Sequence, residues 1–328
     1  MRDSRWVVGD VGALEEDDRF VALDLFELRA AQKQGYRTVP IHELLGARAC
    51  PPAKDVFVAP PTWRGYGFVE LLEWMACARL GKPGASTAVW RAAVKGGATG
   101  VRRILERRGW QLDVQKRGRE VWMSGKLPEP GAMPEPVTIP VSLDGTDLAL
   151  AAGWGVFAGK RVDDGTSLLF QTALAYTPVT RVADIGTGSG VLAASLVAGG
   201  HAAEAVATDV DAVALYLARR NADAAGALVK LFLEDDPRRC PGTPLSLCNI
   251  PTHAQRANTE LLSAGLAART SAGPVLVVVH ASLEGRYTAQ FQRAGTAVRT
   301  VRRAAHAVLE LTARAPQQPA NVLELMLR

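Results

Sequence analysis

Short apolar runs recur along the second half of the chain, separated by longer stretches whose apolar residues follow a helical period. Runs of this kind predict buried strands, and the stretches between them predict helices. The expected strands span residues 182–185, 205–208, 229–233, 245–248, 275–280, 298–302 and 307–311. The expected helices span residues 167–175, 191–197, 212–222 and 258–269. This alternation predicts an α/β fold of the Rossmann-like, doubly wound type.

The first half shows a weaker form of the same pattern. Strands are expected at 20–25, 36–40, 54–59, 87–90, 110–114 and 121–124, and helices at 28–34, 69–80 and 101–108. The first twenty residues are rich in charge and predict an irregular start. Within them, Gly9-Asp10-Val11-Gly12 has too little strand before it to predict a ligand loop.

A proline-rich segment at residues 127–140 separates the two halves. Its prolines predict a stiff, extended linker. The domain boundaries that follow are 1–126 and 141–328, which suits a chain of 328 residues. Residues 137–150 then alternate apolar and polar around Asp144-Gly145, which predicts a hairpin.

Composition excludes several classes of protein. No apolar run approaches the length of a membrane span, and the N-terminus lacks an apolar signal core, so we expect a cytoplasmic protein. The four cysteines are scattered without a C-x-x-C pair, which predicts buried thiols and no metal site. His201, His280 and His306 show no metal-ligand spacing, and we assign them to structure.

Charge is unevenly placed although the net charge is only +5. Residues 1–126 hold 21 basic and 15 acidic residues, whereas residues 127–328 hold 17 and 18. The basic residues gather in one cluster: Arg102, Arg103, Arg107, Arg108, Lys116, Arg117 and Arg119. Such a cluster is typical of a surface that binds a phosphate backbone, although a solvated helix face has the same composition.

A glycine-rich loop follows the strand at 182–185. Gly186, Gly188 and Gly190 occupy every second position, so the backbone can turn sharply and approach a ligand closely. The helix after the loop presents free N–H groups to that ligand. Asp184 at the strand end either orients the loop or meets a cationic ligand. The spacing differs from the dinucleotide motif, leaving S-adenosylmethionine, a nicotinamide or flavin cofactor, and a structural turn as alternatives.

Two further polar positions change this picture. Asp209 ends the next strand, nineteen residues after Gly190, where doubly wound folds place an acid for ribose hydroxyls. Asn249-Ile250-Pro251-Thr252 follows the strand at 245–248. Methyltransferases that act on planar amino groups carry Asn/Asp-Pro-Pro-aromatic at this place. The chain therefore resembles the class I S-adenosylmethionine-dependent methyltransferases.

The resemblance extends to the ribosomal RNA small-subunit guanine-N2 methyltransferases, which duplicate this fold. It is clear over about residues 137–312 and fainter over about 55–126. Its motifs are Gly155-Val156-Phe157, Asp163-Asp164-Gly165 and the apolar helix that follows. The resemblance implies a degenerate N-terminal copy and a cofactor-binding C-terminal copy. Pro60-Pro61-Thr62-Trp63 stands where the second copy has its Asn-Ile-Pro-Thr, without an asparagine.

The resemblance also implies roles for individual residues. The expected cofactor-binding residues are Asp163, Asp184, Gly186, Thr187, Gly188, Gly190, Asp209, Val210, Glu234, Asp235 and Asn249. The expected catalytic residues are Asn249, Ile250 and Pro251, and the expected acceptor-binding residues are Thr252, His253 and the basic cluster. Thr252 replaces the aromatic of the family's motif, and His253 is a candidate to stack on the base instead.

These roles predict an enzyme that methylates a guanine N2 amino group of ribosomal RNA. Two alternatives stay open. A small-molecule N- or O-methyltransferase on the same scaffold would account for the missing aromatic. A non-catalytic RNA-binding protein that has kept only a cofactor pocket would account for the basic cluster. The sequence does not predict an oligomeric state.

Overall fold

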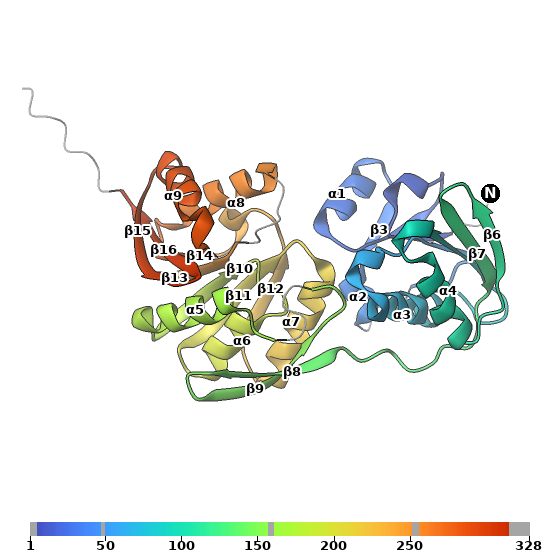
Figure 1. Cartoon of the computed structure of the whole chain (residues 1–328), viewed down its shortest axis with the longest axis horizontal. Helices are drawn as coiled ribbons and strands as arrows, with labels where there is room; N and C mark the ends of the chain where they lie inside the picture. The colour runs from blue at the N-terminus through green and yellow to red at the C-terminus, as the bar shows by residue number, and fades with distance from the viewer. Residues whose placement is uncertain (1–4, 47–49, 157–160, 251–255, 315–328) are drawn as a thin grey trace, which may run out of the picture.

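The structure is a computed structural model, which describes residues 5–46, 50–156, 161–250 and 256–314. It contains two α/β domains, each with a seven-stranded mixed sheet, and a two-stranded hairpin that packs on the C-terminal domain (Figure 1). Among the described residues, no helix has the length and apolar character that a bilayer span requires.

The N-terminal domain has the sheet order β3-β2-β1-β4-β5-β7-β6. Its strands are β1 (Trp6–Val8), β2 (Arg19–Ala22), β3 (Arg37–Pro40), β4 (Asp55–Val58), β5 (Thr87–Ala93), β6 (Asp113–Arg117) and β7 (Glu120–Lys126). Its α-helices are α1 (Leu25–Lys33), α2 (Ile41–Leu45), α3 (Tyr66–Met75) and α4 (Ala98–Arg107).

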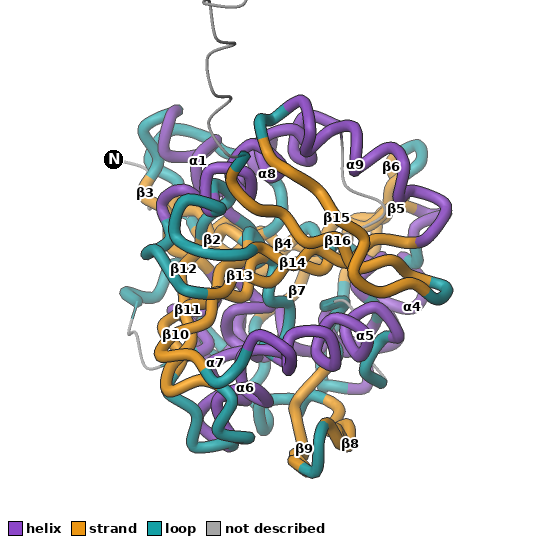
Figure 2. Tube along the Cα trace, turned by 90° about the vertical axis from the view of Figure 1, so that its left-hand side faces the viewer, coloured by secondary structure: helices purple, strands orange, loops and turns teal. Residues whose placement is uncertain are grey.

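The C-terminal domain has the sheet order β12-β11-β10-β13-β14-β16-β15. Its sheet consists of β10 (Val179–Ile185), β11 (Ala202–Asp209), β12 (Val229–Leu233), β13 (Leu245–Asn249), β14 (Val275–His280), β15 (Thr296–Arg303) and β16 (His306–Ala313). The helices are α5 (Asp164–Ala173), α6 (Val191–Ala198), α7 (Ala212–Ala224), α8 (Arg256–Arg269) and α9 (Glu284–Arg293). Figure 2 shows α8 and α9 on one side of the strands and α5, α6 and α7 on the other.

The two sheets have the same topology, which confirms the predicted duplication. In each, the first strand pairs in parallel with the second and the fourth, and the last two strands run antiparallel as a hairpin at one edge. The antiparallel β16 next to β14 is the final strand expected from the sequence. The fold is therefore a Rossmann-like class I methyltransferase fold present twice.

The irregular start predicted for the first twenty residues is wrong, because residues 6–8 form the central strand β1. β1 is three residues long and lies between β2 and β4, and all three of its side chains are buried. A run of three apolar residues between charged neighbours is too short to show the alternation of apolar and polar positions that predicts a strand. The loop Gly9-Asp10-Val11-Gly12 thus occupies the position of the C-terminal glycine loop, but it leads into a short 3-10 turn (Val11–Ala13) and no α-helix precedes β2.

Register identifies what the N-terminal copy lacks. Asp209 stands one residue beyond Thr208, which pairs with Ile185. The equivalent position in the N-terminal sheet is Ala22, which stands one residue beyond Val21, the partner of Val8. The first copy therefore has a buried methyl group where the second has a carboxylate.

The same comparison applies to the loop after the fourth strand. Asn249 follows the residue of β13 that pairs with Ile185, and Ala59 follows the residue of β4 that pairs with Val8. Alanine offers no hydrogen-bonding side chain, so the N-terminal copy is degenerate at both polar positions of the site.

Between the domains, residues 127–136 form no helix or strand, and the hairpin β8 (Val137–Leu143) and β9 (Thr146–Ala152) follows. The hairpin turns at Asp144-Gly145, as predicted. Residues 137–140, which the sequence analysis assigned to the linker, are already paired in β8. Asn221 of α7 receives an N–H bond from Ala151 (2.6 Å) and donates to its carbonyl (2.9 Å), which ties the hairpin to the domain.

The hydrophobic core continues across the domain boundary. Helix α2 packs against α7, and apolar side chains of both lie in one buried cluster with Trp154 and Val156. A shared core of this kind holds the two domains in a defined arrangement, in contrast to domains joined only by a linker.

Candidate active site

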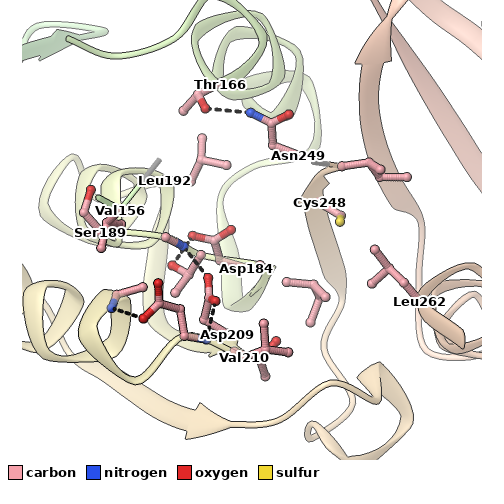
Figure 3. A pocket seen from close by; sticks show the side chains of 18 of the residues that line it. Val156, Thr166, Asp184, Ser189, Leu192, Asp209, Val210, Cys248, Asn249 and Leu262 are labelled. Atoms are coloured by element: carbon pink, nitrogen blue, oxygen red, sulfur yellow. Dashed lines mark hydrogen bonds between the residues drawn. The ribbon is translucent and has the colours of Figure 1, made fainter. Parts of the chain in front are cut away.

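A cavity of about 530 Å³ opens at the carboxyl ends of β10, β11 and β13. Open α/β sheets bind ligands at this edge, where the strand order reverses around the first strand. Its walls come from the glycine loop, the loops after β11, β12 and β13, helix α8, and one side chain of the N-terminal domain. Figure 3 shows Asp184, Asp209 and Asn249 around it.

The glycine loop adopts a conformation that requires glycine. Gly186, Gly188 and Gly190 have φ angles of +74°, +56° and +81°. A Cβ on Gly186 or Gly188 would meet no atom within 4 Å, whereas one on Gly190 would lie 3.0 Å from Ala218 of α7. The third glycine thus allows close packing of α6 on α7, and the first two leave the loop open toward the cavity.

Asp184 organises the loop from below, which is one of the two roles that the sequence left open. Its carboxylate accepts hydrogen bonds from the Thr187 hydroxyl (2.6 Å) and the Ala193 backbone N–H (3.2 Å). The residue is only 2% exposed, and this burial raises the pKa of its carboxyl to about 6.

Asp209 connects the loop to the next strand. One oxygen accepts the Gly188 N–H (2.8 Å) and the other accepts the Asp211 N–H (2.9 Å), as the dashed lines in Figure 3 mark. Burial, and then the neighbouring Asp211 carboxylate, raise its pKa to about 6. Asp211 caps α7 through the Val213 N–H (2.8 Å), so Asp209 is not needed as a helix cap.

Asn249 is held in one orientation on the opposite side of the cavity. Its amide nitrogen donates to Asp163 Oδ2 and to the Thr166 hydroxyl, both at 3.0 Å. Asp163 also caps α5 through the N–H groups of Gly165 and Thr166. Since the amide donors are engaged, the carbonyl oxygen of Asn249 is the side chain's acceptor.

Glu234 and Asp235 line the cavity as predicted, but both are paired across the domain boundary. Arg29 of α1 donates to Asp235 (2.8 Å) and to Glu234 (3.3 Å). The Glu234 carboxylate also accepts the backbone N–H groups of Asp235 and Asp236. These contacts shape the loop after β12.

The other predicted catalytic residues and the predicted acceptor-binding residues lie in different parts of the chain. Ile250 is buried and lines the cavity, whereas Pro251, Thr252 and His253 lie outside the described residues. The basic cluster lies on α4, β6 and the turn after β6, at the end of the N-terminal domain remote from the C-terminal domain (Figure 1).

Six members of the basic cluster are exposed, but Arg108 is not free for a ligand. Arg108 pairs with the buried carboxylate of Glu73, which also accepts the Trp110 indole N–H (2.9 Å). Its role is therefore to neutralise a buried charge, and we no longer expect it to contact RNA.

Two histidines assigned to structure in the sequence analysis line the cavity, so that assignment is corrected. His280 ends β14 and His306 begins β16, and their rings meet edge to face with centroids 5.5 Å apart. A Cβ on Gly165 would lie 3.3 Å from His306, which places that ring beside the Asn249 contacts. The pairing of β14 with β16 brings the two histidines together, and their separation in the sequence does not predict this contact.

Phe26 and Asn221 were also missed. Phe26 of α1 lines the cavity, although it belongs to the N-terminal domain. Asn221 donates to the Ser189 carbonyl (2.7 Å) and so joins the glycine loop to the hairpin. Over the described residues, no three histidines, cysteines or acids gather closely enough to hold a metal ion.

The site fits S-adenosylmethionine better than a dinucleotide. Two carboxylates, Asp184 and Asp209, flank the glycine loop, and a pyrophosphate placed there would meet negative charge. A ligand with a ribose diol and a positive sulfonium meets hydrogen-bond acceptors and a favourable potential instead. The volume also lies in the range of sites for small ligands.

Comparison with known proteins agrees with this geometry. Residues 147–308 match the family model of the methyltransferase small domain. The ribosomal RNA small subunit methyltransferase C of Chromohalobacter salexigens is 36% identical over 114 residues, which are 34% of this chain and 34% of that protein. The release factor glutamine methyltransferase of Bordetella pertussis is 44% identical over 73 residues, 21% of this chain and 27% of that protein. The chain thus matches about a third or less of the length of these relatives.

A solved structure matches nearly the whole chain. The T. thermophilus 16S rRNA N2 G1207 methyltransferase, in complex with AdoMet and guanosine, aligns with a TM-score of 0.75 at 17% identity. The alignment covers 95% of this chain and 88% of that one, so both domains have the same fold. Residues 147–308 thus resemble a methyltransferase small domain, and the chain as a whole has the same duplicated α/β fold as that T. thermophilus methyltransferase.

Proposed function

We propose that the protein is an S-adenosylmethionine-dependent methyltransferase that modifies the N2 amino group of a guanine in ribosomal RNA. An acceptor of this kind implies a cytoplasmic reaction. The observation that carries the proposal is the orientation of Asn249, whose amide donors are occupied by Asp163 and Thr166 at 3.0 Å each.

Asn249 then acts as a positioning acceptor. An amino group on an aromatic ring has a delocalised lone pair and is a poor nucleophile. Hydrogen bonds from its N–H groups to the Asn249 oxygen and the Ile250 carbonyl would favour a pyramidal nitrogen with its lone pair directed at the methyl group. Holding the reacting atoms in line supplies a large part of the rate of such a transfer.

The residues around the glycine loop support a place for the cofactor in this cavity. The backbone at Gly186 and Gly188 would lie along the methionine part, and Asp209 would accept the ribose hydroxyls. Asp235 would lie at the adenine end. When bound, S-adenosylmethionine supplies a methyl group already activated on a sulfonium. The protein's own residues therefore need to bind, orient and exclude water, and no strong acid or base is required.

His280 and His306 support an acceptor with a flat ring. The aromatic of the related motif is absent from Asn249-Ile250-Pro251-Thr252. His306 lies beside the Asn249 contacts, the His280 ring packs edge to face against it, and both line the cavity. Histidine rings stack on nucleobases in other RNA-binding sites.

The test is the turnover of an Asn249→Ala variant on small-subunit ribosomal RNA with labelled cofactor. We expect kcat to fall by about a hundredfold or more, because an oriented polar contact at the reacting atom is worth ~2.7–4 kcal/mol. The Kd for S-adenosylhomocysteine should change little. Thr166→Val, which removes one of the two bonds that orient Asn249, should give a smaller loss. Turnover by Asn249→Ala equal to that of the native protein would contradict the proposal.

A second candidate is a small-molecule methyltransferase, favoured by the altered Asn-Ile-Pro-Thr motif. Methylation of a small aromatic amine or hydroxyl, with ribosomal RNA left unmodified, would support it. Binding of S-adenosylhomocysteine in calorimetry, with neither RNA nor a small acceptor methylated, would instead support a non-catalytic RNA-binding protein that has kept the cofactor pocket.

A further inference from the structure

We propose that the N-terminal domain forms a wall of the cofactor cavity, with Phe26 covering the adenine. This inference rests on the proposed cofactor. It assigns a binding role to a domain that has lost both polar positions of its own site. Phe26 belongs to α1 and lines the same cavity as Val210, Glu234 and Asp235.

The backbone holds α1 against the cofactor loop. Leu25 donates its N–H to the Val210 carbonyl (2.8 Å), and Ala212 donates its N–H to the Leu23 carbonyl (3.1 Å). The two segments thus form an antiparallel bridge between the loops after β2 and β11. Val210 is the neighbour of Asp209, so the start of α1 lies next to the acid that would bind the ribose.

Two arginines of the N-terminal domain add ion pairs to this bridge. Arg64 pairs with Asp211 at 2.8 Å, and its side chain is only 4% exposed. Arg29 pairs with Asp235 and Glu234 one turn further along α1 from Phe26. A buried pair in particular is costly to break, because the partner is left as an unpaired charge. The backbone bridge before Phe26 and the Arg29 ion pairs after it therefore hold Phe26 in its position beside the cavity.

Phe26, Trp63 and Tyr66 are exposed aromatic residues of this domain, and of the three only Phe26 lines the cavity. Phe26 is 40% exposed, while Leu25 and Ala31 of the same helix are buried in the core. A phenyl ring left at the edge of an open cavity has apolar surface that a ligand can cover. Adenine, with two flat faces, is a suitable partner, and stacking of a base on an aromatic side chain contributes measurably to affinity.

The experiment compares the binding of S-adenosylhomocysteine by the full-length protein and its variants in calorimetry. Phe26→Ala should raise Kd about tenfold, which corresponds to ~1.4 kcal/mol. Phe26→Trp should keep most of the affinity, and the Kd of Phe26→Leu should lie between those of Phe26→Trp and Phe26→Ala. The matched control is Gln32→Ala, an exposed position on the same helix, which should leave Kd unchanged.

A second ligand locates the contact. 5′-Methylthioadenosine retains adenine and ribose but lacks the amino-acid part, so Phe26→Ala should weaken it by the same factor. Equal Kd values for native protein and Phe26→Ala would overturn the inference while leaving the proposed function intact. A loss for S-adenosylhomocysteine but none for 5′-methylthioadenosine would also overturn it, because the contact would not be with the adenine. No binding by the native protein would mean that the proposed function itself is wrong.

Discussion

At the scale of single residues, Asp209 combines two tasks in one carboxylate. It accepts backbone N–H groups from Gly188 and Asp211, so it closes the glycine loop onto the next strand. It also lines the cavity, where a ribose would present two hydroxyl donors. Only the ionised form accepts all of these bonds, whereas burial raises its pKa to about 6.

We therefore expect S-adenosylhomocysteine affinity to depend on pH. Kd should be constant above about pH 7 and should rise as pH falls below about 6, approaching tenfold per pH unit because one ionisation is required. Asp209→Ala should raise Kd at neutral pH at least tenfold, since loss of a charge-assisted pair costs ~1.5–3 kcal/mol. Calorimetry between pH 5 and pH 8 measures both effects.

Asp209→Asn gives the control for this prediction. It should bind weakly at every pH and show a flat profile. A pH dependence that survives in Asp209→Asn would assign the titration to another group, such as Asp184. In the absence of ligand the sign is opposite. The folded-state pKa exceeds the usual value of 3.8, so the stability contributed by this group is lost as pH rises from about 4 to 6.

At the scale of elements, the glycine loop is held by its neighbours as much as by its glycines. Asn221 makes three buried hydrogen bonds that join α7, the Ala151 backbone and the Ser189 carbonyl. The loop, the hairpin and α7 are thereby connected through one side chain. Asparagine in the middle of a helix would otherwise be a modest helix former with no evident purpose.

Asn221→Ala should lower the free energy of unfolding by ~2–4 kcal/mol, because it leaves buried backbone groups without partners. Urea denaturation measures this, and the m-value should be unchanged. Asp223→Ala is the matched control on the same helix, at an exposed position whose ion pair with Arg219 is 4.0 Å long. A loss for Asn221→Ala no greater than for Asp223→Ala would contradict the assigned role.

The sequence predicted most elements of the C-terminal domain because its strands are long and bounded by glycine, aspartate or asparagine, but it did not predict α9. The prediction failed where an element is short, or where tertiary contacts determine which residues line the site. Strand β1 has three residues, and its position between two longer strands makes it central. Phe26, His280 and His306 reach the site because segments distant in the sequence pack together. Their spacing along the chain therefore does not predict that they line the same cavity.

At the scale of the whole molecule, the basic cluster and the candidate active site lie in different places. The cavity lies at the seam of the two domains, and the exposed basic cluster lies at the outer end of the N-terminal domain (Figure 1). A small acceptor bound at Asn249 would not reach that end. A polyanion of the size of ribosomal RNA is long enough to reach it, and we expect its phosphates to bind at α4 and β6.

Reversal of Arg102, Arg103, Arg117 and Arg119 to glutamate should therefore weaken binding of ribosomal RNA and flatten its salt dependence by roughly one unit for each phosphate that the protein no longer neutralises. S-adenosylhomocysteine affinity should stay the same. The matched control reverses Arg286, Arg293, Arg302 and Arg314, exposed residues of the other domain, and changes the net charge equally. Filter binding at several salt concentrations measures the slopes. Identical slopes for the two variants would show that the cluster does not bind RNA.

The bridge between the domains has the symmetry of a dimer. The two loops are equivalent by position, since Asp24 and Asp211 each cap the helix that follows and lie opposite each other. The residue after each acid donates to the carbonyl of the residue before the other, which is the reciprocal exchange of an isologous contact about a two-fold axis. A contact of this kind places equivalent loops of the two copies face to face, and through it α1 of the first copy reaches the cavity of the second. Only the second copy keeps polar side chains at its own site, because the first has Ala22 and Ala59 at the positions of Asp209 and Asn249.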